Sequence, residues 1–214
     1  MRLLKKSAKK FFLPFLGAMA LMGCGAEDPN VAGVSGKVTR TGTAEIGGAF
    51  SMIDETGTAV SDADLIGKPH LIYFGFTYCP DICPTSLQKL GAAQQLMGKA
   101  GDDVGFILIT VDPERDTPEK LAEYVSFDAF PSGLRGFTGS VGQVRGAHAV
   151  YKVAVTKSSP EGGPVEDGSI DYTVDHSDII YFMGADGEFA DVFTARSTPQ
   201  DIAVRVRQEL MKKK

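Results

Sequence analysis

The chain has 214 residues, of which 43% are hydrophobic and 23% charged, values that are ordinary for a globular protein. Its length favours a single domain. The formal net charge is −5, and acidic and basic residues are mixed along most of the chain. This pattern argues against a nucleic-acid-binding protein, which needs clustered lysine and arginine.

The N-terminal residues 1–23 have the composition of an export signal. Five basic residues fall within residues 1–10, and an apolar run with small residues at its end fills residues 11–23. This run is too short for a membrane-spanning helix, which needs about 20 apolar residues. A basic head, a short apolar middle and a small-residue exit are typical of a signal peptide.

A lipid anchor is expected directly after this signal. The sequence LMGC (residues 21–24) resembles the bacterial lipoprotein cleavage box, in which the cysteine becomes the lipidated first residue of the mature protein. We expect a lipidated Cys24 and a flexible tether over residues 24–46, followed by a folded domain over residues 47–214. The alternatives are an ordinary secretory signal or an uncleaved short anchor, with Cys24 as a spare thiol.

The first half of the domain predicts a hairpin followed by a strand–helix–strand unit. Residues 49–53 and the stretch after Gly57 are expected to pair as a small hairpin. Apolar runs at residues 70–76 and 104–111 are typical of strands buried on both faces of a sheet. The segment between them, residues 85–99, repeats apolar side chains at helical spacing. The two strands are therefore expected to be parallel, with a right-handed crossover.

The second half continues the alternation of helices and strands. Thr117 is a helix cap followed by proline, and residues 140–143 fit a capping box that opens a second helix. A hairpin over residues 179–193 and a last helix from Thr198 complete the chain. The polar residues 157–171 are expected to form an exposed loop. The whole predicts an α/β fold with a mixed sheet and helices on both faces.

The segment TYCPDICPT (residues 77–85) carries the most reactive side chains. If Cys24 is lipidated, the folded body keeps only Cys79 and Cys83, which is too few for a disulfide-stapled scaffold and favours a chemical role. Pro84 fits the first position of a helix, which would place Cys83 at the cap, where the helix N-terminus stabilises a thiolate. The pair could bind one metal or close into a disulfide; a disulfide that only stiffens the loop is the alternative.

A metal site needs a third ligand, and the chain has three histidines. His70 opens a strand and is expected to be structural, and His148 lies among apolar residues of a helix and is expected to pack there. His176 lies between a polar loop and a strand, where binding sites are commonly built.

Asp112 and Arg115 follow the second buried strand, so they are expected at the same sheet edge as Cys79. There they either frame the site or meet a partner, or they form a local ion pair.

Four segments, taken together, resemble the SCO/SenC copper chaperones over about residues 47–210: YFGFTYCPDICP (residues 73–84), VDPERDTPE (111–119), YTVDHS (172–177) and GADGEF (184–189). The resemblance implies a thioredoxin-like fold and copper bound by Cys79, Cys83 and His176. It also implies that Asp175 influences the site, where its carboxylate either supports and orients the imidazole of His176 or is an ordinary exposed loop carboxylate. Soft thiolates favour Cu(I), while imidazole suits both Cu(I) and Cu(II). Zinc would accept the same ligands, but the affinity order favours copper.

The resemblance also implies a function and partners. Members of that family assemble the binuclear copper (CuA) centre of cytochrome c oxidase, by delivering copper, by reducing the target's cysteines, or both. The expected partners are the CuA-bearing oxidase subunit and other periplasmic copper or thiol proteins, met at the periplasmic face of a bacterial membrane. The alternative is an enzyme, a thiol–disulfide oxidoreductase that uses Cys79 and Cys83 without His176. A thiol peroxidase is disfavoured because no separate resolving cysteine is present.

Overall fold

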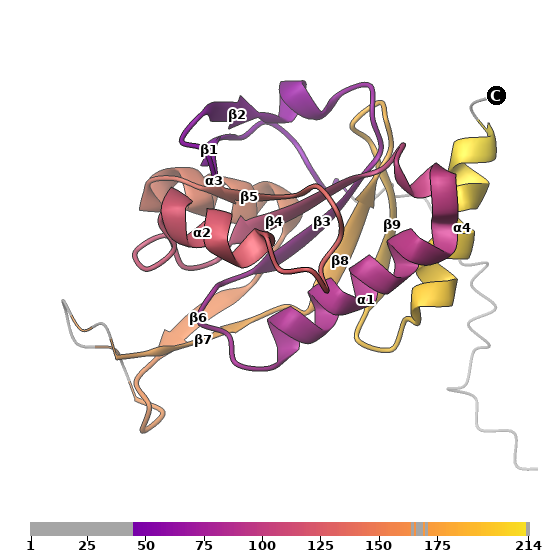
Figure 1. The fold of residues 1–214 in the computed structure, drawn as a ribbon. Helices are drawn as coiled ribbons and strands as arrows, with labels where there is room; N and C mark the ends of the chain where they lie inside the picture. Colours follow the sequence, from indigo (N-terminus) through magenta and orange to yellow (C-terminus); the bar gives the residue numbers. More distant parts are fainter. Residues whose placement is uncertain (1–44, 164, 166–168, 170, 213–214) are drawn as a thin grey trace, which may run out of the picture. The chain divides into compact units, whose positions relative to one another are not determined.

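A mixed β-sheet forms the centre of the computed structural model, which describes residues 45–163, 165, 169 and 171–212. Seven strands lie in the order β2-β1-β5-β4-β3-β8-β9 (Figure 1). Their bounds are β1 (Ser51–Asp54), β2 (Ala59–Ser61), β3 (His70–Gly75), β4 (Gly105–Thr110), β5 (Leu134–Thr138), β8 (Ile179–Met183) and β9 (Phe189–Thr194). Strands β3, β4 and β5 run parallel, and the remaining pairings are antiparallel.

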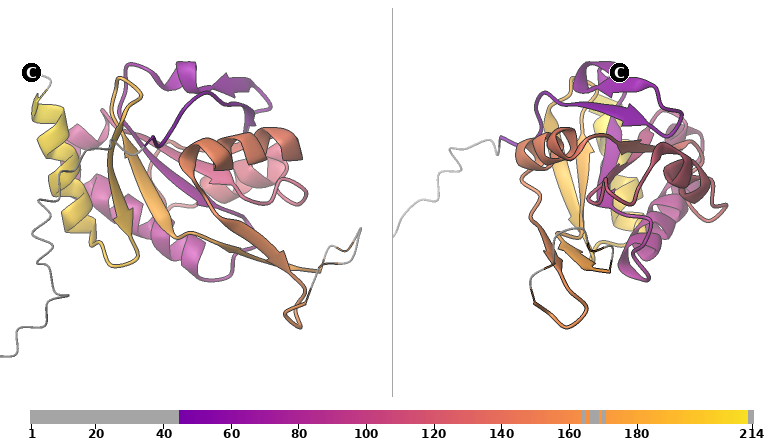
Figure 2. Two further views of the ribbon diagram at one scale, coloured as in Figure 1. Left: turned by 180° about the vertical axis from the view of Figure 1, so that it is seen from behind. Right: turned by 90° about the vertical axis from the view of Figure 1, so that its left-hand side faces the viewer.

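Among the described residues, four α-helices cover the two faces of this sheet (Figure 2). They are α1 (Ile82–Met97), α2 (Pro118–Val125), α3 (Val141–Tyr151) and α4 (Pro199–Lys212), with 3₁₀ turns η1 (Asp62–Leu65) and η2 (Gly98–Gly101). Neighbouring residues of β3 point to opposite faces. Tyr73 therefore faces α1, while Phe74 packs against Tyr151 of α3. The expected α/β architecture with helices on both faces is confirmed.

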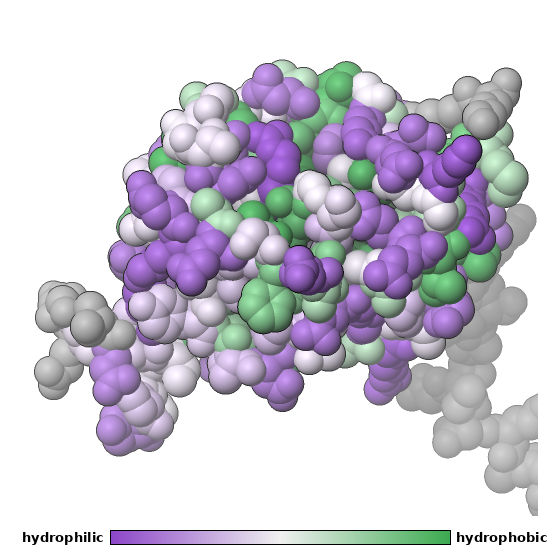
Figure 3. All heavy atoms as spheres, in the orientation of Figure 1, coloured by the Kyte–Doolittle hydropathy of each residue, from purple (hydrophilic) through white to green (hydrophobic). Residues whose placement is uncertain are grey.

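The elements that the sequence predicted from caps and apolar runs are confirmed. The N-terminal hairpin is β1 and β2, the strand–helix–strand unit is β3-α1-β4, and the hairpin near the C-terminus is β8 and β9. Thr117 caps α2 by accepting a hydrogen bond from the Lys120 amide, and Ser140 and Gln143 form the expected capping box of α3. Apolar side chains are mostly withdrawn from the surface, which is largely hydrophilic on the face shown in Figure 3.

Three strands were not predicted. β5 reads LRGFT, where an arginine and a glycine interrupt any apolar run. Strands β6 (Val155–Ser158) and β7 (Thr173–His176) form a separate two-stranded antiparallel ribbon. Residues 157 and 158, which were expected to open the exposed loop, therefore belong to β6. His176 is consequently the last residue of a strand, opposite Val155, rather than part of a loop. Both ribbon strands are short and polar, which hides them from a search for apolar alternation.

The expected signal peptide, the lipidated Cys24 and nearly all of the tether lie outside the described residues. In the part of the chain that is described, no helix combines the length and the apolar character needed to cross a membrane.

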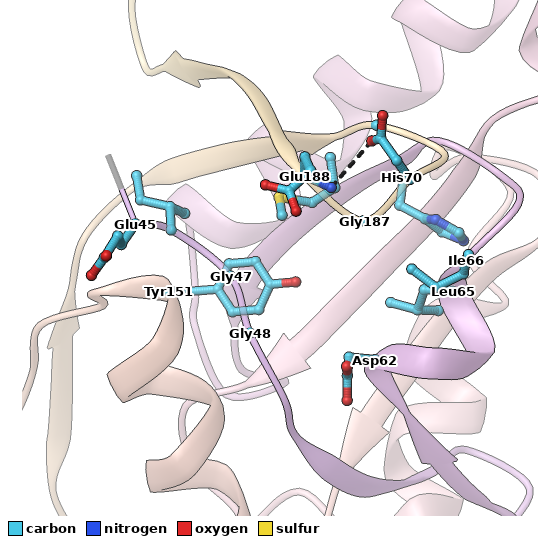
Figure 4. A pocket seen from close by; sticks show the side chains of 14 residues that line it. Glu45, Gly47, Gly48, Asp62, Leu65, Ile66, His70, Tyr151, Gly187 and Glu188 are labelled. Atoms are coloured by element: carbon cyan, nitrogen blue, oxygen red, sulfur yellow. Dashed lines mark hydrogen bonds between the residues drawn. The ribbon is translucent and has the colours of Figure 1, made fainter. Parts of the chain in front are cut away.

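A hollow of about 500 Å³ lies beside the start of β3 (Figure 4). Its lining includes Asp62, Tyr151, Glu188 and the buried His70. Burial lowers the pKa of His70 to about 4, so the ring is neutral at pH 7, in keeping with its expected structural role. Because Cys79 follows the opposite end of β3, this hollow is not part of the cysteine site.

Candidate metal centre

The end of strand β3 makes room for a sulfur atom. A Cβ atom at Gly75 would lie 3.1 Å from Cys83 Sγ and 2.9 Å from Tyr73 Cε1, both too close for an ordinary contact. After Phe76 the chain turns back, and the Cys79 amide donates to the Phe76 carbonyl over 3.3 Å. Glycine at position 75 therefore allows the side chain of Cys83 to enter the core beside the sheet.

The helix start differs from the expected one. α1 begins at Ile82 with Asp81 as its N-cap, so Cys83 is the second helical residue and is fully buried. Its amide donates to Cys79 Sγ over 3.3 Å. The helix N-terminus thus acts on the sulfur of Cys79, and the expectation of a cap thiolate at Cys83 is wrong.

The two thiols have opposite pKa shifts because they share one hydrogen bond. The Cys83 thiol donates to Cys79, and together with hydrogen bonds from backbone amides this lowers the pKa of Cys79 to about 4. The same hydrogen bond and burial raise the pKa of Cys83. The pair therefore holds a single thiolate at neutral pH, on the half-exposed Cys79. Both cysteines are free, without a disulfide between them.

The imidazole of His176 reaches the same place from a distant part of the chain. Its Nε2 lies 3.5 Å from Cys83 Sγ, and its Nδ1 lies 3.1 Å from the Ser177 carbonyl oxygen. The rings of Tyr73 and Phe76 flank it edge-on. A carbonyl oxygen can only accept, so Nδ1 carries the proton. In the neutral ring Nε2 then keeps its lone pair and directs it toward the sulfur.

These distances suit a soft metal ion. Ligand bonds of about 2.3 Å to sulfur and about 2.0 Å to nitrogen place the two atoms about 3.5 Å apart around one tetrahedral ion. The observed 3.5 Å between Cys83 Sγ and His176 Nε2 is close to that value. Among the residues described, no three Cys, His, Asp or Glu side chains form a closed ligand cluster. Cys83 instead contacts both of the other groups: its amide donates to Cys79 Sγ, and its Sγ lies 3.5 Å from His176 Nε2.

Asp175 lies beside His176 in the chain but not beside its ring. Successive residues of a strand point to opposite faces, so Asp175 is exposed while Val174 and His176 turn toward the protein. The partner of the imidazole Nδ1 is the Ser177 carbonyl. The structure therefore does not bring the Asp175 carboxylate to the imidazole, as its expected supporting role would require.

Asp112 and Arg115 form the local ion pair that was one of the two expectations for them. The Arg115 Nε donates to the fully buried Asp112, and its Nη1 donates to the Tyr172 carbonyl over 3.1 Å. The guanidinium also lies 3.8 Å from the ring centre of Tyr172 and 4.9 Å from that of Tyr78. Arg115 thereby connects residues 76–81, the loop between β3 and α1 that carries Cys79 (here called the cysteine loop), to the start of strand β7, which carries His176.

Sequence reasoning missed the function of Asp116, which anchors the cysteine loop through hydrogen bonds to Thr77. Its carboxylate accepts hydrogen bonds from the Thr77 amide, from the Thr77 hydroxyl over 2.6 Å and from the Thr110 hydroxyl over 2.6 Å. Asp116 is 1% exposed, and burial raises its pKa. No spacing rule connects residues 77 and 116, so only the fold reveals this contact.

His148 packs edge-on against Phe74 as expected, and its Nε2 lies 3.2 Å from the Thr110 carbonyl.

The low pKa of Cys79 predicts unusual reactivity toward alkylating reagents. At pH 6 Cys79 is already ionised, whereas a thiol with the ordinary pKa of 9.0 gains about tenfold in thiolate per pH unit. We expect iodoacetamide to label Cys79 before Cys83, at a rate that is nearly constant from pH 6 to pH 8. Mass spectrometry of quenched samples measures both rates. Preferential labelling of Cys83, or a tenfold rise of the Cys79 rate per pH unit, would contradict the assignment.

A comparison with known proteins identifies the family. The SCO1/SenC family model matches residues 38–211. The chain belongs to the SCO1/SenC family. This SCO1/SenC chain is 42% identical over 163 residues to protein sco1 of the fission yeast Schizosaccharomyces pombe, a match that covers 76% of the chain and 60% of the yeast protein.

Solved structures of SCO1/SenC relatives have the same fold. ScoI of Bradyrhizobium japonicum, solved with copper bound, is 41% identical with a TM-score of 0.66, over 77% of this chain and 99% of that one. BsSco, described as having a disulfide switch and as a member of the Sco family of cytochrome c oxidase assembly proteins, is 25% identical with a TM-score of 0.58, over 78% and 94%. The thioredoxin-like fold implied by the sequence motifs is thereby confirmed.

Proposed function

We propose that the chain is a copper-binding metallochaperone in which Cys79, Cys83 and His176 hold one copper ion. The observation that carries this proposal is the approach of His176 Nε2 to within 3.5 Å of Cys83 Sγ, next to the Cys79 thiolate. The copper-bound relative from Bradyrhizobium japonicum supports the choice of metal.

The donor set suits a metal that must be passed on. Two thiolates favour Cu(I), and the imidazole also accommodates Cu(II). Divalent metals follow an affinity order in which copper exceeds zinc at a given site, which favours copper over zinc here. Three protein ligands leave copper open to an incoming ligand, so a partner's side chain can bind before this chain releases the ion. Cys79 is half-exposed and is therefore the ligand that such a partner meets first.

The proposed destination is the CuA site of cytochrome c oxidase, in keeping with the assembly role stated for the relative BsSco. We further propose that Cys24 is lipidated and holds the chain at the periplasmic face of the cell envelope, where other copper or thiol proteins are also within reach. The order of basic, apolar and small residues before Cys24 supports this location.

A second function, thiol–disulfide exchange, is favoured by the pKa values of the two cysteines. The Cys79 thiolate attacks a disulfide of the partner and displaces one partner thiolate, which forms a mixed disulfide. Cys83 then loses its proton and attacks Cys79 Sγ, which releases the second partner thiolate. The partner gains two electrons, and this chain is left with a Cys79–Cys83 disulfide. His176 takes no part in either step, so the two functions are separable.

Copper titration tests the metallochaperone proposal. We expect the purified, reduced protein to bind one Cu(I) per chain in competition with a chelator, because the described residues contain one such pair of thiols with an adjacent imidazole. The double variant Cys79→Ser, Cys83→Ser removes the soft ligands and should bind none at that chelator strength. Equal copper stoichiometry in the wild type and the double variant would contradict the proposed site.

A further inference from the structure

A hydrogen bond joins the two segments that carry the proposed ligands. Ser86 Oγ on α1 donates to Asp178 Oδ1 over 2.9 Å. Ser86 is 3% exposed and lies three residues after Cys83, on the same side of the helix. Asp178 lies two residues after His176, in the connection between β7 and β8. The contact therefore fixes the distance between the cysteine-bearing turn and the histidine-bearing strand.

The connection around Asp178 is tight and includes the partner of the imidazole. The Ile179 amide donates to the Ser177 carbonyl over 3.0 Å, which makes Asp178 the central residue of a three-residue turn. The same Ser177 carbonyl lies 3.1 Å from His176 Nδ1. Any displacement of Asp178 therefore moves the carbonyl oxygen that orients the ring.

We propose that Asp178 is a positioning residue that acts through Ser86 and the Ser177 carbonyl to hold the His176 ring against the sulfurs. This inference rests on the proposed ligand set and deepens it. The ribbon of β6 and β7 is a separate two-stranded sheet, and such sheets are only marginally stable alone. Arg115 ties the start of β7 to the cysteine loop, and the Ser86–Asp178 hydrogen bond ties its end to α1.

The position of Asp178 also separates it from the aspartate on the other side of His176. Asp175 is exposed on the opposite face of β7, whereas Asp178 is half-buried and contacts α1. Support for the imidazole thus comes from the residue after the strand, through the backbone, rather than from the residue before the ligand.

Four single variants test this inference through copper binding. Asp178→Ala and Ser86→Ala each remove the hydrogen bond and should weaken Cu(II) binding about tenfold, the lower end of the effect of groups that orient a metal ligand. Asp178→Asn keeps an accepting oxygen and should restore most of the affinity. Asp64→Ala is the matched control, because Ser61 Oγ donates to Asp64 in the same way over 2.8 Å at the exposed turn η1. The double variant Ser86→Ala, Asp178→Ala should bind no worse than either single one.

A second measurement reports on the ring without copper. The ¹⁵N chemical shifts of His176 in the reduced, copper-free protein depend on its proton and on its contact with sulfur. We expect them to change in Asp178→Ala and Ser86→Ala and to stay unchanged in Asp64→Ala. If Asp178→Ala matches Asp64→Ala in both measurements, the positioning role is wrong while the copper site stands. If removal of His176 itself leaves copper affinity unchanged, the proposed function fails, and the ring shifts alone decide the role of Asp178.

Discussion

Replacing His176 by alanine is expected to weaken copper binding by about a hundredfold or more. Loss of a group that only orients a ligand costs 10- to 100-fold in affinity, so loss of the nitrogen ligand itself should cost at least the upper value. His176 Nε2 lies 3.5 Å from Cys83 Sγ, whereas His148 Nε2 lies 3.2 Å from the Thr110 carbonyl and His70 lines the hollow at the opposite end of β3. Competition with a chelator of known affinity measures the change.

The control for this variant is the other half-buried histidine. His148→Gln removes an imidazole that bonds the Thr110 carbonyl, away from the sulfurs, and should leave copper affinity unchanged. Both free thiols of His176→Ala should still react with a disulfide reagent, because the cysteine pair does not need the ring to meet. Wild-type copper affinity in purified His176→Ala would exclude the three-ligand site and leave only dithiol chemistry.

Replacing Asp116 by alanine is expected to lower the free energy of unfolding by about 3 kcal/mol, since several buried hydrogen bonds of about 1 kcal/mol each are lost and their donors stay buried. The carboxylate accepts from the Thr77 amide and from the hydroxyls of Thr77 and Thr110. Thr77 lies two residues before Cys79, so the same change loosens the cysteine loop. Urea unfolding measures the stability, and the iodoacetamide rates of the two cysteines report on the loop. An unchanged urea midpoint would contradict the anchoring role.

Asp116→Asn separates the shape of this side chain from its charge. Burial raises the pKa of Asp116 in the folded state. The contribution of Asp116 to the free energy of unfolding is therefore greatest at acid pH and is lost as the pH rises through the folded-state pKa. An asparagine does not titrate. The destabilisation caused by Asp116→Asn should therefore be larger at pH 4 than at pH 7, as measured by urea unfolding of both proteins. A cost that grows with pH would show that the carboxylate is stabilised as the anion.

Much of the fold follows from features that act locally along the chain. Caps such as Thr117 and Ser140 set helix starts through hydrogen bonds within three residues, and the buried parallel strands β3 and β4 read as apolar runs. The ribbon of β6 and β7 has neither signal, because its pairing joins residues 155–158 to residues 173–176 across a polar insertion. Pairing of that kind is decided by the fold rather than by local preference.

The candidate site divides in the same way. The cysteines and His176 are chemically distinctive, and their motifs resemble a known family, so the sequence alone predicts them. The wrong expectation concerned Cys83, because Asp81 takes the cap and the helix begins at Ile82, which transfers the stabilised thiolate to Cys79. Asp178 is an ordinary aspartate in the sequence. Its partner is 92 residues away, and only the packed structure reveals the hydrogen bond.

The separate ribbon of β6 and β7 gives the candidate site one stiff side and one soft side. Cys83 is buried in α1 beside the main sheet, so local opening at Cys83 requires disruption of the core. Cys79 lies on the short loop between β3 and α1, whereas the imidazole of His176 lies at the end of a separate two-stranded element. We therefore expect thermal opening to detach the imidazole of His176, the proposed nitrogen ligand, before it disturbs the buried thiol of Cys83. In the proposed copper site, a recipient that binds the ribbon would displace the imidazole at a lower free-energy cost than a recipient that must remove copper from three fixed ligands.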